Sequence, residues 1–285
     1  MRLKTPIFDP ADRLMPVKVT LPASPALREA PPAAAGVSQL RQPVFKRFKC
    51  LIIVPAFNES RSVAKLVRRL NLLLPDCHVL VIDDGSTDDT VRQIPPTASV
   101  VSLPFNLGIG GAMQTGYRYA ALHGYDIAVQ VDGDGQHRPR EVQKLVEALV
   151  KSEADLVVGS RFLEATSFVP SLSRMTGIKV LSAWIRCLCG LKITDCTSGF
   201  RAVNNKVIRA YAHWYPEDYP EPEVVLLLHR SKFKVVEIPV RMRRRMYGRS
   251  SISLAHGFFY VLKVSVCLFL DMVRQPWPSG KIGSP

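Results

Sequence analysis

Residues 50–60 read CLIIVPAFNES, and this stretch sets the pattern of the fold. A short apolar run with β-branched residues is broken at Pro55, and a polar Asn-Glu-Ser segment follows it. Helical periodicity then extends from Val63 to Leu74. This order predicts a buried strand, a loop and a helix.

The same unit repeats along the chain. Apolar runs predict further strands at residues 78–83, 99–104, 127–132 and 155–160. Helices are expected after the segment DGSTDDT, from the segment NLGIGGA to His123, and from Arg140 to Lys151. Strands that are apolar on both faces and alternate with helices predict an α/β fold with a mostly parallel, Rossmann-like sheet covered on both faces.

Polar residues follow each of these strands, where an open α/β sheet binds its ligands. They include Asn58 and Glu59, Asp83 and Asp84, the segment 106–111, Asp132 and Asp134, and the segment 159–161. Each group taken alone fits a loop or a helix cap. The carboxyl ends of parallel strands meet at one edge of the sheet, which we call the rim. Five polar groups on this rim predict a ligand site.

The net charge of +14 is distributed unevenly. Residues 1–49 carry nine basic and three acidic groups, and residues 229–249 carry eight and one, whereas residues 50–228 carry 18 and 19. A neutral body with basic ends argues against a nucleic-acid-binding protein. The six cysteines form no CxxC pair, and the N-terminus lacks an apolar signal region, so we expect a reducing, cytoplasmic location.

Three segments are expected. Residues 1–48 are rich in proline and alanine and predict a mostly irregular, basic extension. Residues 49–251 form the α/β domain. Residues 252–285 contain an apolar stretch that is too short and too interrupted for a confident membrane span, and they predict a C-terminal helix.

Asp132, Asp134 and Gln136 place oxygen ligands at alternate positions after a buried strand. Mg²⁺ and Mn²⁺ prefer such ligands and complete their coordination with substrate phosphates. The glycines of 106-NLGIGGA-112, Gly108 first, allow a backbone to approach a ligand before a helix. Their spacing fits neither a dinucleotide fingerprint nor a P-loop, so the residues favour a metal-assisted site for a nucleoside diphosphate.

Seven motifs in one order resemble the family 2 glycosyltransferases with the GT-A fold, and above all the dolichyl- and polyprenyl-phosphate hexose synthases. The motifs are IIVPAFNES (52–60), VIDDGSTDDT (81–90), NLGIGGAMQTGYRYA (106–120), QVDGDGQHRP (130–139), DLVVGSRF (155–162), DCTSGFRAV (195–203) and EIPVRMRRRMYGRSS (237–251).

The resemblance implies a role for each matching position. Residues that line the nucleotide-sugar pocket would be Pro55, Phe57, Glu59, Asp84, Gly108 and Asp132. Metal ligands for Mg²⁺ or Mn²⁺ would be Asp132, Asp134 and Gln136. Arginines that face donor and acceptor phosphates would be Arg161, Arg174 and Arg245, and together with Asp134 they would stabilise the charge of the departing diphosphate.

The sequence is compatible with two classes of acceptor substrate for the transferred sugar. A polyprenyl phosphate is already an anion and needs little base catalysis, whereas a saccharide hydroxyl needs a carboxylate to remove its proton. Glu221 and Glu223 of the segment YPEPE, and Asp195, are candidates for that base; Glu223 equally fits a helix N-terminus after proline. The sequence favours the phosphate acceptor, used at the cytoplasmic face of the cell membrane.

The basic segment 229–249 precedes the apolar segment HGFFYVLKVSVCLFLDMVRQPW. Such an order is typical of a helix that lies on an anionic membrane, with Phe258, Phe259, Tyr260, Leu268 and Phe269 in the acyl boundary. The alternatives are a helix packed on the domain or against another subunit, and a small membrane-protein partner that supplies the membrane spans.

Overall fold

The computed structural model describes residues 18–20, 43–164, 172–218, 220–243 and 254–273. Its strands, in chain order, are β1 (Lys18–Thr20), β2 (Cys50–Ala56), β3 (His78–Asp83), β4 (Ser99–Ser102), β5 (Ile127–Gln130), β6 (Leu156–Ser160), β7 (Arg201–Asn204) and β8 (Val235–Pro239). Its helices are α1 (Pro43–Arg47), α2 (Val63–Leu73), α3 (Thr90–Gln93), α4 (Gly108–Leu122), α5 (Pro139–Lys151), α6 (Leu172–Cys189), α7 (Asn205–His213), α8 (Pro220–Arg230) and α9 (Leu254–Val273).

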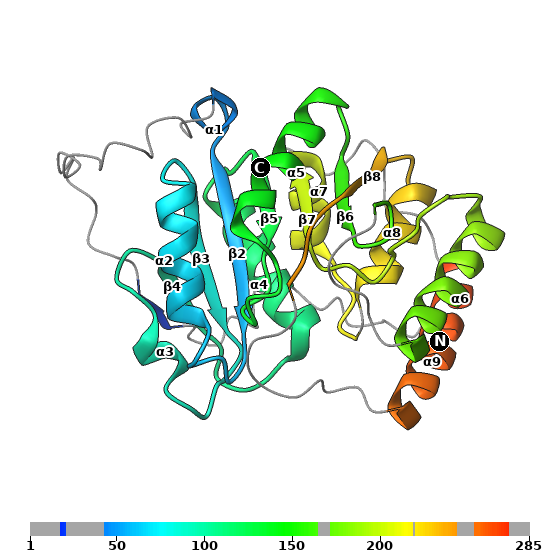
Figure 1. Cartoon of the computed structure of the whole chain (residues 1–285), viewed down its shortest axis with the longest axis horizontal. Helices are drawn as coiled ribbons and strands as arrows, with labels where there is room; N and C mark the ends of the chain where they lie inside the picture. The colour runs from blue at the N-terminus through cyan, green and yellow to red at the C-terminus, as the bar shows by residue number, and fades with distance from the viewer. Residues whose placement is uncertain (1–17, 21–42, 165–171, 219, 244–253, 274–285) are drawn as a thin grey trace, which may run out of the picture.

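The eight strands form one sheet in the order β1-β4-β3-β2-β5-β7-β6-β8 (Figure 1). Strands β4, β3, β2 and β5 are mutually parallel, and β6 is parallel to β8. Strand β7 is antiparallel to both β5 and β6, so β6 points the same way as β5. The carboxyl ends of β2 to β6 therefore meet at one edge, as the sequence predicts.

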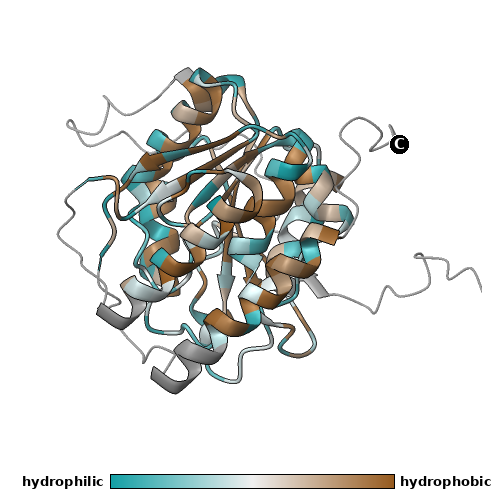
Figure 2. Ribbon diagram, turned by 90° about the vertical axis from the view of Figure 1, so that its right-hand side faces the viewer, coloured by the Kyte–Doolittle hydropathy of each residue, from teal (hydrophilic) through white to brown (hydrophobic). Residues whose placement is uncertain are grey.

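Alternate residues of β2 serve the two faces of the sheet. Leu51 and Ile53 belong to a core with α4, α6, α7, α8 and α9, whereas Ile52 and Val54 belong to a core with α2 and α5. All four side chains are almost completely buried. Figure 2, coloured by hydropathy, shows mostly hydrophobic strands lying between helices that also carry hydrophilic residues. The prediction of an α/β sheet covered on both faces is confirmed.

The structure differs from the sequence expectation in three places. The helix after DGSTDDT is only the single turn α3. The sheet contains two strands that the sequence does not predict, because β7 lies between β5 and β6, and β8 pairs with β6 at the edge. Within the segment expected to be irregular, β1 pairs with β4 and α1 precedes β2. Strands β1, β7 and β8 each contain a charged residue, namely Lys18, Arg201 and Glu237, so no uninterrupted apolar run identifies them. Strands β4 and β5 are just as short as β7, but neither contains a charged residue.

Candidate active site

The loop after β2 and the loop after β3 are joined by side chains. The Asn58 N–H donates to Ser86 Oγ (3.0 Å), the Thr87 N–H donates to Asn58 Oδ1 (2.9 Å), and the Glu59 N–H donates to Thr90 Oγ1 (2.8 Å). Asn58 has φ +56°, the left-handed region that asparagine tolerates. These bonds shape one side of the rim.

Asp84 links three segments of the rim. Its N–H donates to the Ala56 carbonyl (2.9 Å), and its carboxylate accepts the Leu107 N–H (2.7 Å). Burial raises the pKa of Asp84, and hydrogen bonds from the Leu107 and Gly108 N–H groups partly oppose that rise. Asp84 therefore fixes the loop that leads into α4.

The other residues expected in the nucleotide-sugar pocket lie around this loop. Pro55 is buried at the end of β2, and Phe57 beyond it is 44% exposed. The Glu59 carboxylate accepts the Ser62 hydroxyl (2.6 Å). Gly108 has φ +77°, and a Cβ there would meet open space. The structure thus brings Pro55, Phe57, Glu59, Asp84 and Gly108 to one region of the rim.

The glycines of 106-NLGIGGA-112 have different roles from one another. A Cβ on Gly110 would lie 2.2 Å from the carbonyl oxygens of Pro216 and Glu217, so the start of α4 packs directly against that segment. A Cβ on Gly111 would meet the Leu107 side chain at 2.5 Å. The close backbone approach at Gly110 and Gly111 is therefore to the protein itself, and Gly108 alone faces open space.

Asp132 and Asp134 lie in the tight loop after β5. The Gly133 N–H donates to the Pro55 carbonyl (3.2 Å), and a Cβ there would stand 2.9 Å from that oxygen. Asp134 is 8% exposed; its Oδ1 accepts the Gln136 N–H (2.9 Å), and its Oδ2 accepts the Gln136 side-chain amide. The Asp132 side chain is 34% exposed.

The donor set of this loop fits a hard divalent cation. Two carboxylates, one partly open to solvent, are held in a turn without a bulky side chain between them, and oxygen ligands of this kind suit Mg²⁺ or Mn²⁺. No group of three or more His, Cys, Asp or Glu side chains suitable for a metal occurs within the described residues. The expected set of two aspartates and Gln136 is smaller than such a group, and a cation held there would need further oxygens, such as those of a substrate phosphate, to complete its coordination.

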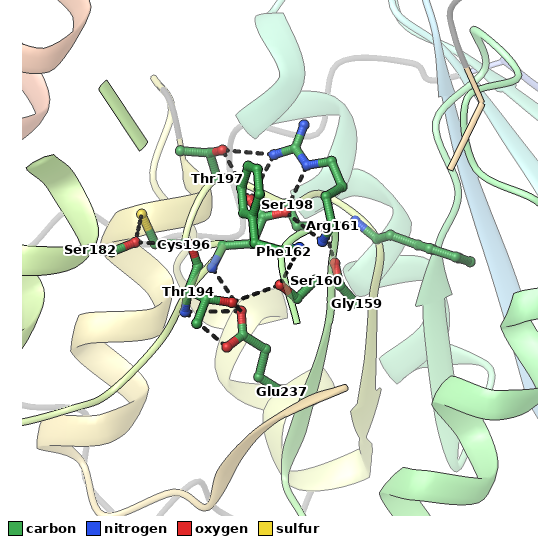
Figure 3. Close-up of polar contacts among 12 residues, drawn as sticks. Gly159, Ser160, Arg161, Phe162, Ser182, Thr194, Cys196, Thr197, Ser198 and Glu237 are labelled. Atoms are coloured by element: carbon green, nitrogen blue, oxygen red, sulfur yellow. Dashed lines mark hydrogen bonds and ion pairs between the residues drawn. The ribbon is translucent and has the colours of Figure 1, made fainter. Parts of the chain in front are cut away.

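Arg161 lies directly after β6 in a buried ion pair with Asp195. Its Nε and Nη2 donate to the two carboxylate oxygens, each at 2.7 Å, and its backbone N–H donates to Asp195 Oδ2 (3.1 Å). The Arg161 Nη2 also reaches Thr197 Oγ1 (3.0 Å), as Figure 3 shows. Burial opposes the charge on Arg161, but the hydrogen bonds and charge of Asp195 outweigh burial and raise the arginine pKa.

Glu237 of β8 holds the segment that carries Asp195 (Figure 3). Its carboxylate accepts the N–H of Thr194 (2.8 Å), the hydroxyl of Thr194 (2.8 Å) and the N–H of Asp195 (2.7 Å). The sequence predicts no role for Glu237, although Glu237 is the first residue of the motif EIPVRMRRRMYGRSS (237–251). It identifies Asp195 only as a candidate base, whereas the structure places the Asp195 carboxylate against Arg161.

Helix α8 brings two more carboxylates near the rim. Glu223 is 8% exposed in the first helical turn, and Glu221 lies two residues earlier. Burial raises the pKa of Glu221; the charge of Arg201 opposes this effect, and the charge of Asp132 adds to it. Buried Arg201 donates to the Glu221 carbonyl (2.8 Å) and so ties α8 to β7.

Two expected phosphate-binding residues are not described in full. Arg174 belongs to α6, but its side chain lies outside the described part, and Arg245 falls in the segment 244–253, also outside it. Phe258 and Phe259 likewise belong to α9 without described side chains.

Helix α9 packs against α6 and α8 through one face. Leu268 is completely buried, so its expected place in a lipid boundary is wrong: apolar contacts with the domain cover it. Tyr260 is partly buried against the same core. The opposite face exposes apolar side chains, namely Leu262, Val266, Phe269, Leu270 and Val273. Among the described residues, no helix has the length and apolar character required to cross a membrane.

Comparison with known proteins identifies related sequences. The model of the family "Glycosyl transferase family 2" matches residues 51–211. The chain is 32% identical over 216 residues to an undecaprenyl-phosphate mannosyltransferase of Micrococcus luteus, covering 72% of this chain and 88% of the relative. It is 30% identical over 240 residues to a polyprenol monophosphomannose synthase of Mycolicibacterium smegmatis, covering 79% of this chain and 90% of the relative.

A solved structure supports the fold. The glucosyl-3-phosphoglycerate synthase of Mycobacterium tuberculosis, in complex with Mn²⁺, UDP-glucose and phosphoglyceric acid, superposes with a TM-score of 0.62. The alignment covers 86% of this chain and 85% of that chain at 21% identity. This likeness shows that the two chains share their overall architecture.

Proposed function

The chain belongs to glycosyl transferase family 2 and is a glycosyltransferase, and from that premise we propose that it moves a hexose from a nucleoside-diphosphate sugar to a polyprenyl phosphate, with inversion at the anomeric carbon. The observation that carries the proposal is the convergence of the Asp132–Asp134 loop and the Arg161–Asp195 pair at one edge of the sheet. Carboxylates for a cation and a fixed guanidinium suit a reaction whose leaving group is a diphosphate.

The donor would lie along the rim from Asp84 to Asp134. Pro55, Phe57, Glu59, Asp84 and Gly108 would line the nucleoside side. Asp132 and Asp134 would hold Mg²⁺ or Mn²⁺ against the diphosphate, with Gln136 orienting Asp134 or adding its oxygen. The bound cation would supply positive charge that stabilises the departing diphosphate. The Mn²⁺ bound by the structural neighbour supports a divalent metal.

The arginines would receive the phosphate groups. Asp195 and Thr197 hold Arg161 through Nε and Nη2, and the guanidinium fixed in this way would face a substrate phosphate. Fixed bidentate geometry is the reason for arginine at such a place. Arg174 and Arg245 are proposed for the same role on the basis of the motifs alone.

The acceptor proposal rests on the two relatives that act on polyprenyl phosphates. The enzyme would work at the cytoplasmic face of the cell membrane. The exposed apolar face of α9 and the basic segment 229–249 would contact an anionic bilayer or a small membrane-protein partner.

The alternative acceptor is the hydroxyl of a saccharide or a lipid-linked oligosaccharide. Glu223 would then be the base, and burial at the start of α8 is the observation in its favour. Glu223→Gln separates the two acceptors, because a phosphate acceptor needs no proton removed, and its transfer rate should survive that change.

The test is incubation of the enzyme with labelled UDP- and GDP-sugars, undecaprenyl phosphate and Mg²⁺ or Mn²⁺, followed by extraction into organic solvent. Labelled lipid is the expected product, and Asp134→Ala should abolish it while leaving the far-ultraviolet circular dichroism unchanged. Label that appears only on added soluble saccharides would refute the phosphate acceptor. Full activity of Asp134→Ala in the presence of a chelator would refute the proposal that transfer requires a divalent cation.

A further inference from the structure

The carboxylate of Asp132 has a side chain beside each of its oxygens. The Gln130 Nε2 donates to Oδ1 at 3.0 Å, and the His137 Nε2 lies 3.6 Å from Oδ2. Gln130 comes from β5 and His137 from the loop before α5, and they are only 1% and 4% exposed. Two buried polar side chains from different elements thus flank one partly exposed carboxylate.

The tautomer of His137 follows from its second nitrogen. Nδ1 accepts the backbone N–H of Asp132 at 3.0 Å, so Nδ1 carries no proton. In the neutral ring the proton is then on Nε2, the nitrogen that faces Asp132 Oδ2. The ring stacks on Phe200 with centroids 4.5 Å apart and an interplanar angle of 11°, which prevents it from turning. His137 therefore contacts both the backbone and the carboxylate side of Asp132.

Gly199 lies close to the Asp132 carboxylate on a third side, away from Gln130 and His137 in the chain. A Cβ at this position would stand 2.7 Å from Gln130 Nε2 and 3.3 Å from both carboxylate oxygens of Asp132. The 195–200 loop can approach the pair only because residue 199 has no side chain. Any larger residue would displace the amide or the carboxylate.

The oxygen of the Gln130 side-chain amide indicates why a polar residue occupies this position. Its Oε1 is buried without a hydrogen-bond partner among the described residues. A buried acceptor without a partner costs stability, so an apolar side chain of the same size would suit the core of β5 as well or better. The feature that an apolar side chain would lack is the donor to Asp132.

We propose that Gln130 and His137 are positioning residues that fix the Asp132 carboxylate in the orientation in which it binds a divalent cation. The inference rests on the proposed function, because it takes Asp132 as a metal ligand. Groups that hold a ligand in place typically change metal affinity by about 10- to 100-fold when they are removed.

The principal test is Gln130→Met, studied by titrating the full chain with Mn²⁺ and following the free ion by electron paramagnetic resonance. We expect Mn²⁺ affinity to fall about 10- to 100-fold while the melting temperature stays near that of the wild type. Methionine conserves the volume and removes the unpartnered acceptor. Gln143→Met on α5 is the matched control, because the Gln143 side chain donates to Glu147 one turn along the same helix.

A second variant changes no polar group. Gly199→Ala should weaken Mn²⁺ binding to a similar degree, because its methyl group displaces the amide or the carboxylate. Wild-type Mn²⁺ affinity in both variants would overturn the proposal. Asp132→Asn separates this outcome from failure of the proposed function: if Asp132→Asn also binds Mn²⁺ as the wild type does, the assignment of Asp132 to the metal is wrong.

A spectroscopic readout is independent of metal and activity. Long-range ¹H–¹⁵N correlation spectra of the metal-free protein should show His137 as the Nε2–H tautomer. The Nδ1–H tautomer would overturn the proposal, because the ring could then neither accept the Asp132 N–H nor direct a proton toward its carboxylate.

Discussion

Asp195→Ala tests how the fold holds its candidate catalytic arginine. Asp195 is completely buried and Arg161 is 6% exposed, so the substitution leaves a guanidinium in the interior without its counter-ion. Breaking a buried pair from one side costs about 3–5 kcal/mol. Because the total stability of a domain is only about 5–15 kcal/mol, this loss removes a large part of it and should greatly lower the unfolding midpoint.

The assay is urea unfolding at neutral pH, followed by circular dichroism. Asp89→Ala is the matched control, because the Arg92–Asp89 pair has side chains that are 85% and 63% exposed, and such a pair contributes about 0–1 kcal/mol. The double variant Arg161→Met with Asp195→Leu should recover part of the loss, since it leaves no unpaired charge. A loss for Asp195→Ala no larger than that for Asp89→Ala would refute the buried-pair argument.

Three further outcomes are expected. Gly110→Ala should lower the melting temperature, because its methyl group would overlap the Pro216 carbonyl at 2.2 Å; an unchanged melting temperature contradicts that packing. Leu268 is buried, so Leu268→Ala should lower the free energy of unfolding by about 2–5 kcal/mol. Phe269 is exposed, so Phe269→Ser should leave stability nearly unchanged and reduce cosedimentation with anionic vesicles. His78 is exposed at the start of β3, but partial desolvation and the charge of Lys49 lower its pKa, so stability should fall slightly as the pH drops below about 6.5. His78→Gln should flatten that dependence in denaturant titrations at several pH values.

The sequence predicts those parts of the site that depend on strand ends. Asp84, Asp132 and Arg161 each follow a buried apolar run, and parallel strands necessarily bring such residues to one edge. Asp132 and Asp134 could be picked out as candidate metal ligands for the same reason, because carboxylate oxygens at a strand end suit a divalent cation. Their roles in binding remain predictions.

Residues that act across the fold are not predictable in this way. Glu237 is 42 residues from Asp195 in the chain, and their contact depends on the pairing of β6 with β8. The close packing of Gly110 against the segment at residue 216 depends on where α4 crosses that segment. Local periodicity and spacing carry no information on contacts between such distant segments.

The reversed strand β7 explains how the two halves of the site are coupled. Because β7 is antiparallel to its neighbours, the residues before it, and not those after it, lie at the rim. This places Asp195 against Arg161 and Gly199 against Asp132, with only three residues between them in the chain. A parallel strand in this position would carry the 195–200 loop to the far edge of the sheet. The Asp132 side and the Arg161 side of the candidate site therefore share one short loop, and a substitution that shifts this loop should alter both.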